Sequence, residues 1–132
     1  MSTATERIAV SIEDSIKSNP TLFKAVTSAT EFFEVGLDYI DLQAQTKAIH
    51  PDIRWSVNGE QILQLVYREE LPVGSGYQNT IRIPVAQILD AVDRKSWMLR
   101  LLQSVNDRRY SSVITKFEQM IKEREEAEAN GQ

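Results

Sequence analysis

The chain has 132 residues, which suits a single domain, and its hydrophobic content of 42% and charged content of 26% are ordinary for a globular protein. The net charge of −4 argues against a dedicated nucleic-acid-binding protein, and the absence of cysteine excludes disulfides, thiolate nucleophiles and cysteine metal sites. No apolar run approaches the length that crosses a bilayer, and the first ten residues lack the apolar core of a secretory signal. We therefore expect a cytoplasmic protein.

The first part of the chain predicts two helices joined by a sharp turn. Over residues 4–18, isoleucines recur at intervals of four, the spacing of one helix face. These are Ile8, Ile12 and Ile16. Asn19-Pro20 then supplies an N-cap and a first helical residue, since the N–H that proline lacks would be unpaired there. The second helix should end at about Ala48, before His50-Pro51, and form an antiparallel hairpin with the first.

This second helix carries two stripes of different character. Its apolar residues recur at gaps of three and four, as on the buried face of an amphipathic helix. They are Leu22, Val26, Ala29, Phe33, Leu37, Ile40 and Ala44. One step round the helix lies a stripe made only of carboxylates: Glu31, Glu34, Asp38 and Asp41. Gly36, in the middle of this predicted helix, indicates a close helix contact, a bend or a break. If the helix breaks there, residues 37–44 would form a strand instead.

A β-hairpin is predicted next. Apolar and polar residues alternate before Asn58-Gly59, which favours a tight turn, and a β-rich run follows. A two-residue turn would pair Trp55 with Ile62, whereas a three-residue loop with a bulge would pair Trp55 with Leu63. We favour the second because it collects more apolar side chains on one face. That face would carry Ile53, Trp55, Val57, Leu63, Leu65 and Tyr67.

The last third predicts one more strand and two helices. Residues 72–76 form a loop by composition, and residues 78–83 form a strand that Pro84 ends. Pro84 can begin a helix, and a last helix follows from about Asp107. Its apolar residues, which suit the core or an interface, are Tyr110, Val113, Ile114, Phe117, Met120 and Ile121.

The order of these elements predicts an α+β fold. We expect an N-terminal helical hairpin, a small three-stranded antiparallel sheet and two C-terminal helices packed on one face. Residues 1–121 should form one domain, and residues 122–132 a charged, fraying tail.

The sequence carries no signature of catalysis, metal binding or cofactor binding. His50 is the single histidine, and without cysteine a zinc site would need carboxylates alone, which is unusual for zinc. Beside a predicted helix end, His50 has a structural role or none. Gly74-Ser75-Gly76 lacks the surroundings of a nucleophile elbow and the following lysine of a phosphate-binding loop.

Two surfaces could instead bind a partner or a ligand. The carboxylate stripe of Glu31, Glu34, Asp38 and Asp41 is either a solvated face or a docking surface for a basic protein partner. Arg54, Arg68 and Arg82 fall one on each predicted strand, alternating with the core residues, and Gln64 and Thr80 share their parity. Such a sheet face could hold an anionic ligand, because guanidinium groups donate paired hydrogen bonds to phosphate and carboxylate.

We therefore expect a non-catalytic binding protein, an adaptor, assembly factor or inhibitor, that docks on a larger macromolecule through a helical surface. Small, acidic, cysteine-free chains of this kind are typical of phage and bacterial accessory factors. Four apolar helix faces exceed what three strands can cover, so self-association as a homodimer would bury the surplus. The alternative is a protein that captures a nucleotide-like ligand through Arg54, Arg68, Thr80 and Arg82 on the sheet.

Overall fold

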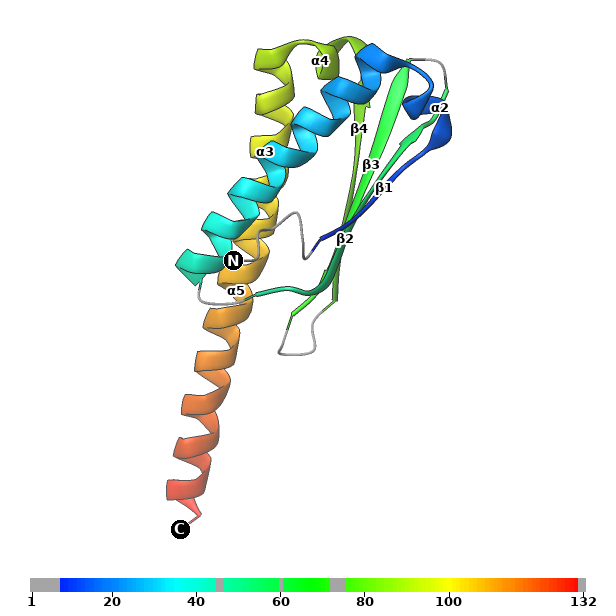
Figure 1. Ribbon diagram of the computed structural model, residues 1–132. Coiled ribbons are helices and arrows are strands. Elements are labelled where there is room, and N and C mark those ends of the chain that lie inside the picture. The colour runs from blue at the N-terminus through cyan, green and yellow to red at the C-terminus, as the bar shows by residue number, and fades with distance from the viewer. Residues whose placement is uncertain (1–7, 45–46, 60, 72–75, 131–132) are drawn as a thin grey trace.

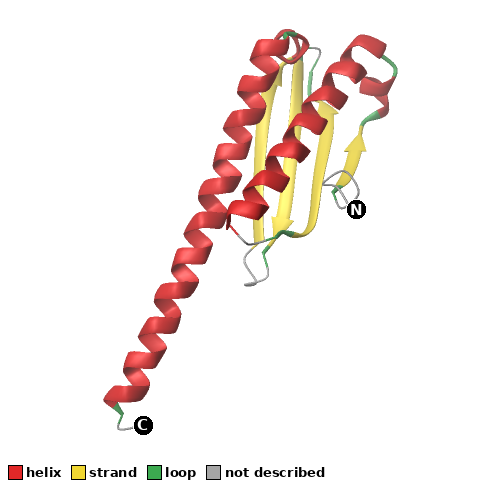
Figure 2. Ribbon diagram, turned by 60° about the vertical axis from the view of Figure 1, so that its left-hand side comes forward, coloured by secondary structure: helices red, strands yellow, loops and turns green. Residues whose placement is uncertain are grey.

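The computed structural model describes residues 8–44, 47–59, 61–71 and 76–130, without the side chains of residues 43–44 and 109–119. The fold is α+β, as the sequence predicts: helices cover one face of a four-stranded mixed sheet, and no described element covers the other (Figures 1 and 2). The elements in chain order are β1 (Ala9–Ile12), α2 (Asp14–Lys17), α3 (Pro20–Ala44), β2 (Ile49–Val57), β3 (Ile62–Glu70), β4 (Gly76–Pro84), α4 (Val85–Leu89) and α5 (Ala91–Ala129).

The N-terminal segment is a strand and a short helix, so the expected helix over residues 4–18 and the helical hairpin are wrong. An interval of four between isoleucines fits the period of two in a strand as well as a helical face. β1 pairs in parallel with β2, with Val10 beside Ile53 and Ile12 beside Trp55. Parallel neighbours need a crossover, which α2 and α3 provide. The sheet therefore has the order β1-β2-β3-β4, in place of the expected three antiparallel strands.

Helix α3 begins as predicted and runs without a break through Gly36. The Asn19 side chain caps it by accepting a hydrogen bond from the Leu22 N–H at 3.2 Å, and Pro20 is its first residue. The alternative strand at residues 37–44 is wrong, and the helix ends at Ala44 rather than about Ala48. A Cβ atom built on Gly36 would lie 2.3 Å from Cδ1 of Leu102, so the glycine marks a close contact between α3 and α5.

The hairpin of β2 and β3 has the predicted face but a different register. Trp55 pairs with Leu65, and Val57 with Leu63, so residues 58–61 form the connection and both expected registers are wrong. A shift of two residues preserves the face, and this is why the six predicted side chains still point together into the core. Gly59 has a φ of 82°, a conformation that glycine adopts without strain.

The C-terminal helices divide at Asp90, far from the expected break near Asp107. The Asp90 carboxylate accepts hydrogen bonds from the backbone N–H groups of Val92 and Asp93, so it caps the start of α5. From there α5 continues for 39 residues, to Ala129. The domain limit at residue 121 stays a prediction, and most of the expected loop at 72–76 lies outside the described residues.

The core lies between the sheet and the layer formed by α3 and α5 (Figure 2). The rings of Phe33 on α3 and Tyr67 on β3 meet edge to face with their centroids 5.0 Å apart. Trp55 on β2 donates its indole N–H to the Thr30 hydroxyl at 3.0 Å, so this buried polar group is paired. These contacts fix α3 on the sheet and leave its opposite side exposed.

Candidate functional site

The four carboxylates predicted as a docking surface do not share one environment. Glu31 and Asp38 are exposed, whereas Glu34 and Asp41 are only 2% and 5% exposed. The stripe is therefore divided, because at about 100° per residue Glu34 and Asp41 lie about 60° round the helix from Glu31 and Asp38 respectively, on the packed side of α3. Of the four, only Glu31 and Asp38 are exposed to solvent.

The arginines predicted on one sheet face do lie together. The pairings of Arg54 with Val66, of Gln64 with Arg82 and of Val66 with Thr80 place these side chains on the face opposite the helices. Arg68 shares that face, since it pairs with Asp52. The carboxylate of Asp52 lies 3.6 Å from the Arg54 guanidinium and 3.4 Å from that of Arg68. Two of the three arginines thus already have an anionic neighbour within the protein.

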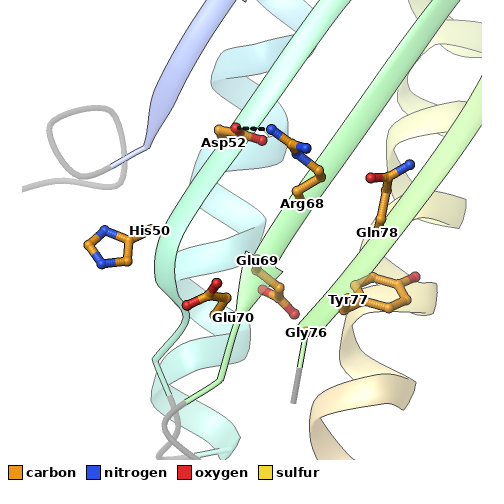
Figure 3. A pocket seen from close by; sticks show the side chains of 8 residues that line it. All are labelled: His50, Asp52, Arg68, Glu69, Glu70, Gly76, Tyr77 and Gln78. Carbon is orange, nitrogen blue, oxygen red and sulfur yellow. Dashed lines mark hydrogen bonds and ion pairs between the residues drawn. The ribbon is translucent and has the colours of Figure 1, made fainter. Parts of the chain in front are cut away.

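A hollow of about 610 Å³ lies at the end of the sheet where β2, β3 and β4 meet (Figure 3). Its lining residues are His50, Asp52, Arg68, Glu69, Glu70, Gly76, Tyr77 and Gln78. In Figure 3 the Asp52 carboxylate faces the Arg68 guanidinium, whereas the His50 ring stands apart from them. His50 belongs to β2 with a φ of 52°, so its expected position at a helix end is wrong.

Glu69 is the one buried acid of this hollow, and its position follows from strand alternation. It lies two residues after Tyr67, on the core side of β3, and the Tyr67 hydroxyl donates a hydrogen bond to its Oε2 at 2.6 Å. Burial raises the pKa of Glu69 to about 6, although the Tyr67 hydroxyl and the Arg108 charge both act to lower it. The Glu69 carboxyl accepts a structural hydrogen bond and the His50 ring points elsewhere, so these two described residues are not arranged as a pair for acid–base catalysis.

A largely apolar concavity lies on the outer side of the helical layer, between α3 and α5. A groove of about 520 Å³ is lined mainly by apolar side chains of both helices, and a second hollow of about 290 Å³ adjoins it and shares Phe32 and Val35. The larger part is lined by Phe32, Val35, Gly36, Tyr39, Ile40, Leu99, Leu102, Gln103 and Asn106. We call these two hollows together the helical groove.

Exposed apolar side chains crowd the rim of the helical groove. Val35, Tyr39 and Leu42 recur at gaps of four and three, so they share one side of α3, and Leu99 faces them from α5. Val35 is 71% exposed although it is fully apolar. Gly36 forms part of the floor, where its missing side chain lets α5 approach.

The smaller hollow forms one end of the helical groove, and this end is basic. Its lining includes Arg94 and Lys95 of α5 and Glu31 of α3. Arg94 donates a hydrogen bond to the Ile88 carbonyl oxygen at 3.0 Å, which holds its side chain in place. Lys95 is exposed. The groove thus combines an apolar middle with two cations and one anion at its end.

The chain matches no known protein family and no curated protein sequence. Its function must therefore be argued from its own surfaces. Among the described residues, histidine and carboxylate side chains do not gather into a group that could hold a metal ion. None of the described helices is both long enough and apolar enough to cross a membrane.

Sequence reasoning missed the helical groove and the buried acid, although both left signals. The row of Val35, Tyr39 and Leu42 lies beside the core stripe of α3 and makes that helix apolar on two sides. Glu69 falls on the apolar parity of β3, which predicts burial. Trp97 packs against the core, while Tyr110 and Phe117, which we expect in the core or an interface, lie outside the described side chains.

Proposed function

We propose that this protein is non-catalytic and binds a protein partner through the helical groove. The observation that carries this proposal is the convergence of exposed apolar side chains from α3 and α5 on one concave surface that faces away from the sheet. Contiguous apolar surface of this kind is costly in water and is typical of protein-binding sites. An adaptor, assembly factor or inhibitor, such as a phage or bacterial accessory factor, has this design.

The shape and charge of the helical groove favour a helical segment as its occupant. Grooves between two helices accept the apolar face of a third helix, with contacts that recur every three or four residues. Arg94 and Lys95 at one end favour acidic residues in that part of the partner segment. The expected basic partner of the carboxylate stripe is thereby replaced by an apolar helix with an acidic end, since only Glu31 and Asp38 are exposed on the stripe.

Site-specific photo-cross-linking tests this function. A photoreactive phenylalanine analogue replaces Val35 on the groove rim, and the matched control carries it at exposed Thr80 on the sheet face. We expect position 35 to cross-link to a helical peptide with acidic residues, identified by sequencing the cross-linked peptide in a mass spectrometer. Lys95→Glu should reduce that yield. No protein cross-link at position 35, or equal yields at both positions, would contradict a docking role for the groove.

The sheet face is the second candidate, because its register brings three arginines together on a surface that no described element covers. We propose that any anionic ligand would be held chiefly by Arg82 and Thr80, since Asp52 neutralises much of the charge of Arg54 and Arg68. Thermal unfolding with and without a nucleotide such as ADP tests this site. A stabilisation that Arg82→Ala abolishes would support it, and an unchanged midpoint would exclude it.

A further inference from the structure

The C-terminal half of α5 extends beyond the rest of the described chain. Arg108 of α5 contacts the end of β4, where its Nη2 donates a hydrogen bond to the Gly76 carbonyl oxygen at 3.2 Å. Beyond that point the helix projects past the sheet and past α3, as both ribbon views show (Figures 1 and 2). Every residue from Met120 to Asn130 is exposed.

A helical segment of this length is only marginally stable on its own in water. Its charges weaken it further, because glutamates near a helix C-terminus meet the negative end of the helix dipole. These are Glu123, Glu125, Glu126 and Glu128, and the last turn contains no basic residue. Packing against a partner would therefore stabilise this part of the helix, whose residues Met120 to Asn130 are all exposed.

One face of α5 carries exposed apolar side chains in both halves of the helix. Leu99 follows Val92 by seven residues, about two turns, and Ile121 follows Val92 by twenty-nine residues, about eight turns at 3.6 residues per turn. This spacing makes Val92, Leu99 and Ile121 point in nearly the same direction. Their side chains are 77%, 55% and 43% exposed. Leu99 also lines the helical groove, so this face and the groove are continuous.

The two halves of α5 carry opposite charge. From Ala91 to Arg108 the cations are Arg94, Lys95, Arg100 and Arg108, against Asp93 and Asp107. From Met120 to Ala129 the anions are Glu123, Glu125, Glu126 and Glu128, against Lys122 and Arg124. Two such helices attract each other when antiparallel and repel when parallel, because only the antiparallel arrangement sets each basic half beside an acidic half.

We infer that the occupant of the helical groove is the projecting half of α5 from a second copy of this chain. This inference rests on the docking function proposed above and names its partner. The two α5 helices lie antiparallel, and each apolar, acidic C-terminal half packs along the groove of the other copy. Two-fold symmetry then fills both grooves and covers both projecting halves with one interface.

The apolar contacts set a register that can be tested. With Ile121 of one copy beside Leu99 of the other, antiparallel helices bring Glu125 to the level of Lys95, since both chains rise by the same step in opposite directions and a step of four residues stays on the same helix face. The acidic end then lies at the basic end of the groove.

Charge reversal on the full-length chain tests this register by sedimentation velocity. We expect the wild type to be a dimer, and Lys95→Glu or Glu125→Lys alone to weaken dimerisation about tenfold, since each interface contains the pair twice. Combining Lys95→Glu with Glu125→Lys should restore the dimer, and Arg54→Glu on the sheet face is the control that should leave it unchanged. A monomeric wild type, or a double variant no better than the singles, would overturn the inference.

Engineered cysteines test the direction of the helices, which is simple because the chain has no cysteine of its own. A mixture of Leu99→Cys and Ile121→Cys chains should form a disulfide between the two variants on oxidation. A parallel pair would join each variant to itself instead and would overturn the antiparallel arrangement. If the wild type is monomeric but Val35 cross-links to an acidic helix of another protein, the docking function stands and the second copy is excluded. With no cross-link and no dimer, both proposals fail.

Discussion

Gly36→Ala tests the close packing of α3 on α5 on which the helical groove depends. An added Cβ would lie 2.3 Å from Cδ1, 2.9 Å from Cδ2 and 3.2 Å from Cγ of Leu102. Carbon atoms in good contact are about 3.5–4.0 Å apart, so the Leu102 side chain must move by more than an ångström. Leu102 is buried, and overpacking of this kind costs about 1–3 kcal/mol.

Helix propensity acts in the opposite direction. Alanine is favoured over glycine by about 1 kcal/mol in a helix interior, so Gly36→Ala should lower the free energy of unfolding by about 1 kcal/mol in all. Leu102→Ala removes all three crowding atoms at a cost of about 2–5 kcal/mol. In that background Gly36→Ala should be stabilising by about 1 kcal/mol, because only the propensity gain remains. The two substitutions should thus be coupled by about 2 kcal/mol.

Urea unfolding of the wild type, the two single variants and the double variant measures this coupling. All four should be followed by tryptophan fluorescence at one protein concentration, since self-association would otherwise shift the midpoints. If Gly36→Ala stabilises the wild type as much as it stabilises Leu102→Ala, the close contact between α3 and α5 does not exist as described.

Three further predictions concern the sheet and the start of α5. Because the folded-state pKa of Glu69 is about 6 against an ordinary 4.5, the folded state holds the proton more tightly, and stability falls as pH rises through this window. Relative to the wild type, the free energy of unfolding of Glu69→Gln should therefore rise by about 1 kcal/mol from pH 5 to pH 7, as measured by urea unfolding. If the two proteins show parallel pH profiles, the raised pKa is refuted. Thr30→Val leaves the buried Trp55 N–H without its acceptor and should cost about 1–3 kcal/mol, whereas Thr30→Ser should retain most of the stability. Asp90→Ala removes the cap of α5 and should cost about 1 kcal/mol in thermal or urea unfolding, with Asp90→Asn as the control. An alanine variant as stable as the asparagine variant would show that the cap is dispensable.

Elements whose signal is local could be predicted from the sequence. The start of α3 at Asn19-Pro20, its apolar stripe and the shared face of β2 and β3 follow from capping chemistry and from the periods of helices and strands. The exact pairing of Trp55 could not be predicted, because a shift of two residues leaves the same side chains on the same face. The arginines of the sheet face were placed correctly for the same reason of parity.

Only the tertiary structure decided what depends on contacts between distant segments. β1 is a strand because β2 lies beside it, and a four-residue segment that follows Ile8 and ends at Ile12 does not reveal a parallel partner more than forty positions away. The way α3 packs on the sheet and on α5 decides which of its sides is buried. It buries Glu34 and Asp41 and leaves Val35 and Tyr39 exposed. The periodicity of the sequence does not fix the rotation of α3 about its own axis closely enough to predict this. The helical groove exists because Gly36 and Leu102, far apart in the chain, come into contact. By itself, the sequence determined which side chains share a face; the packing of the helices decided which of those faces water can reach.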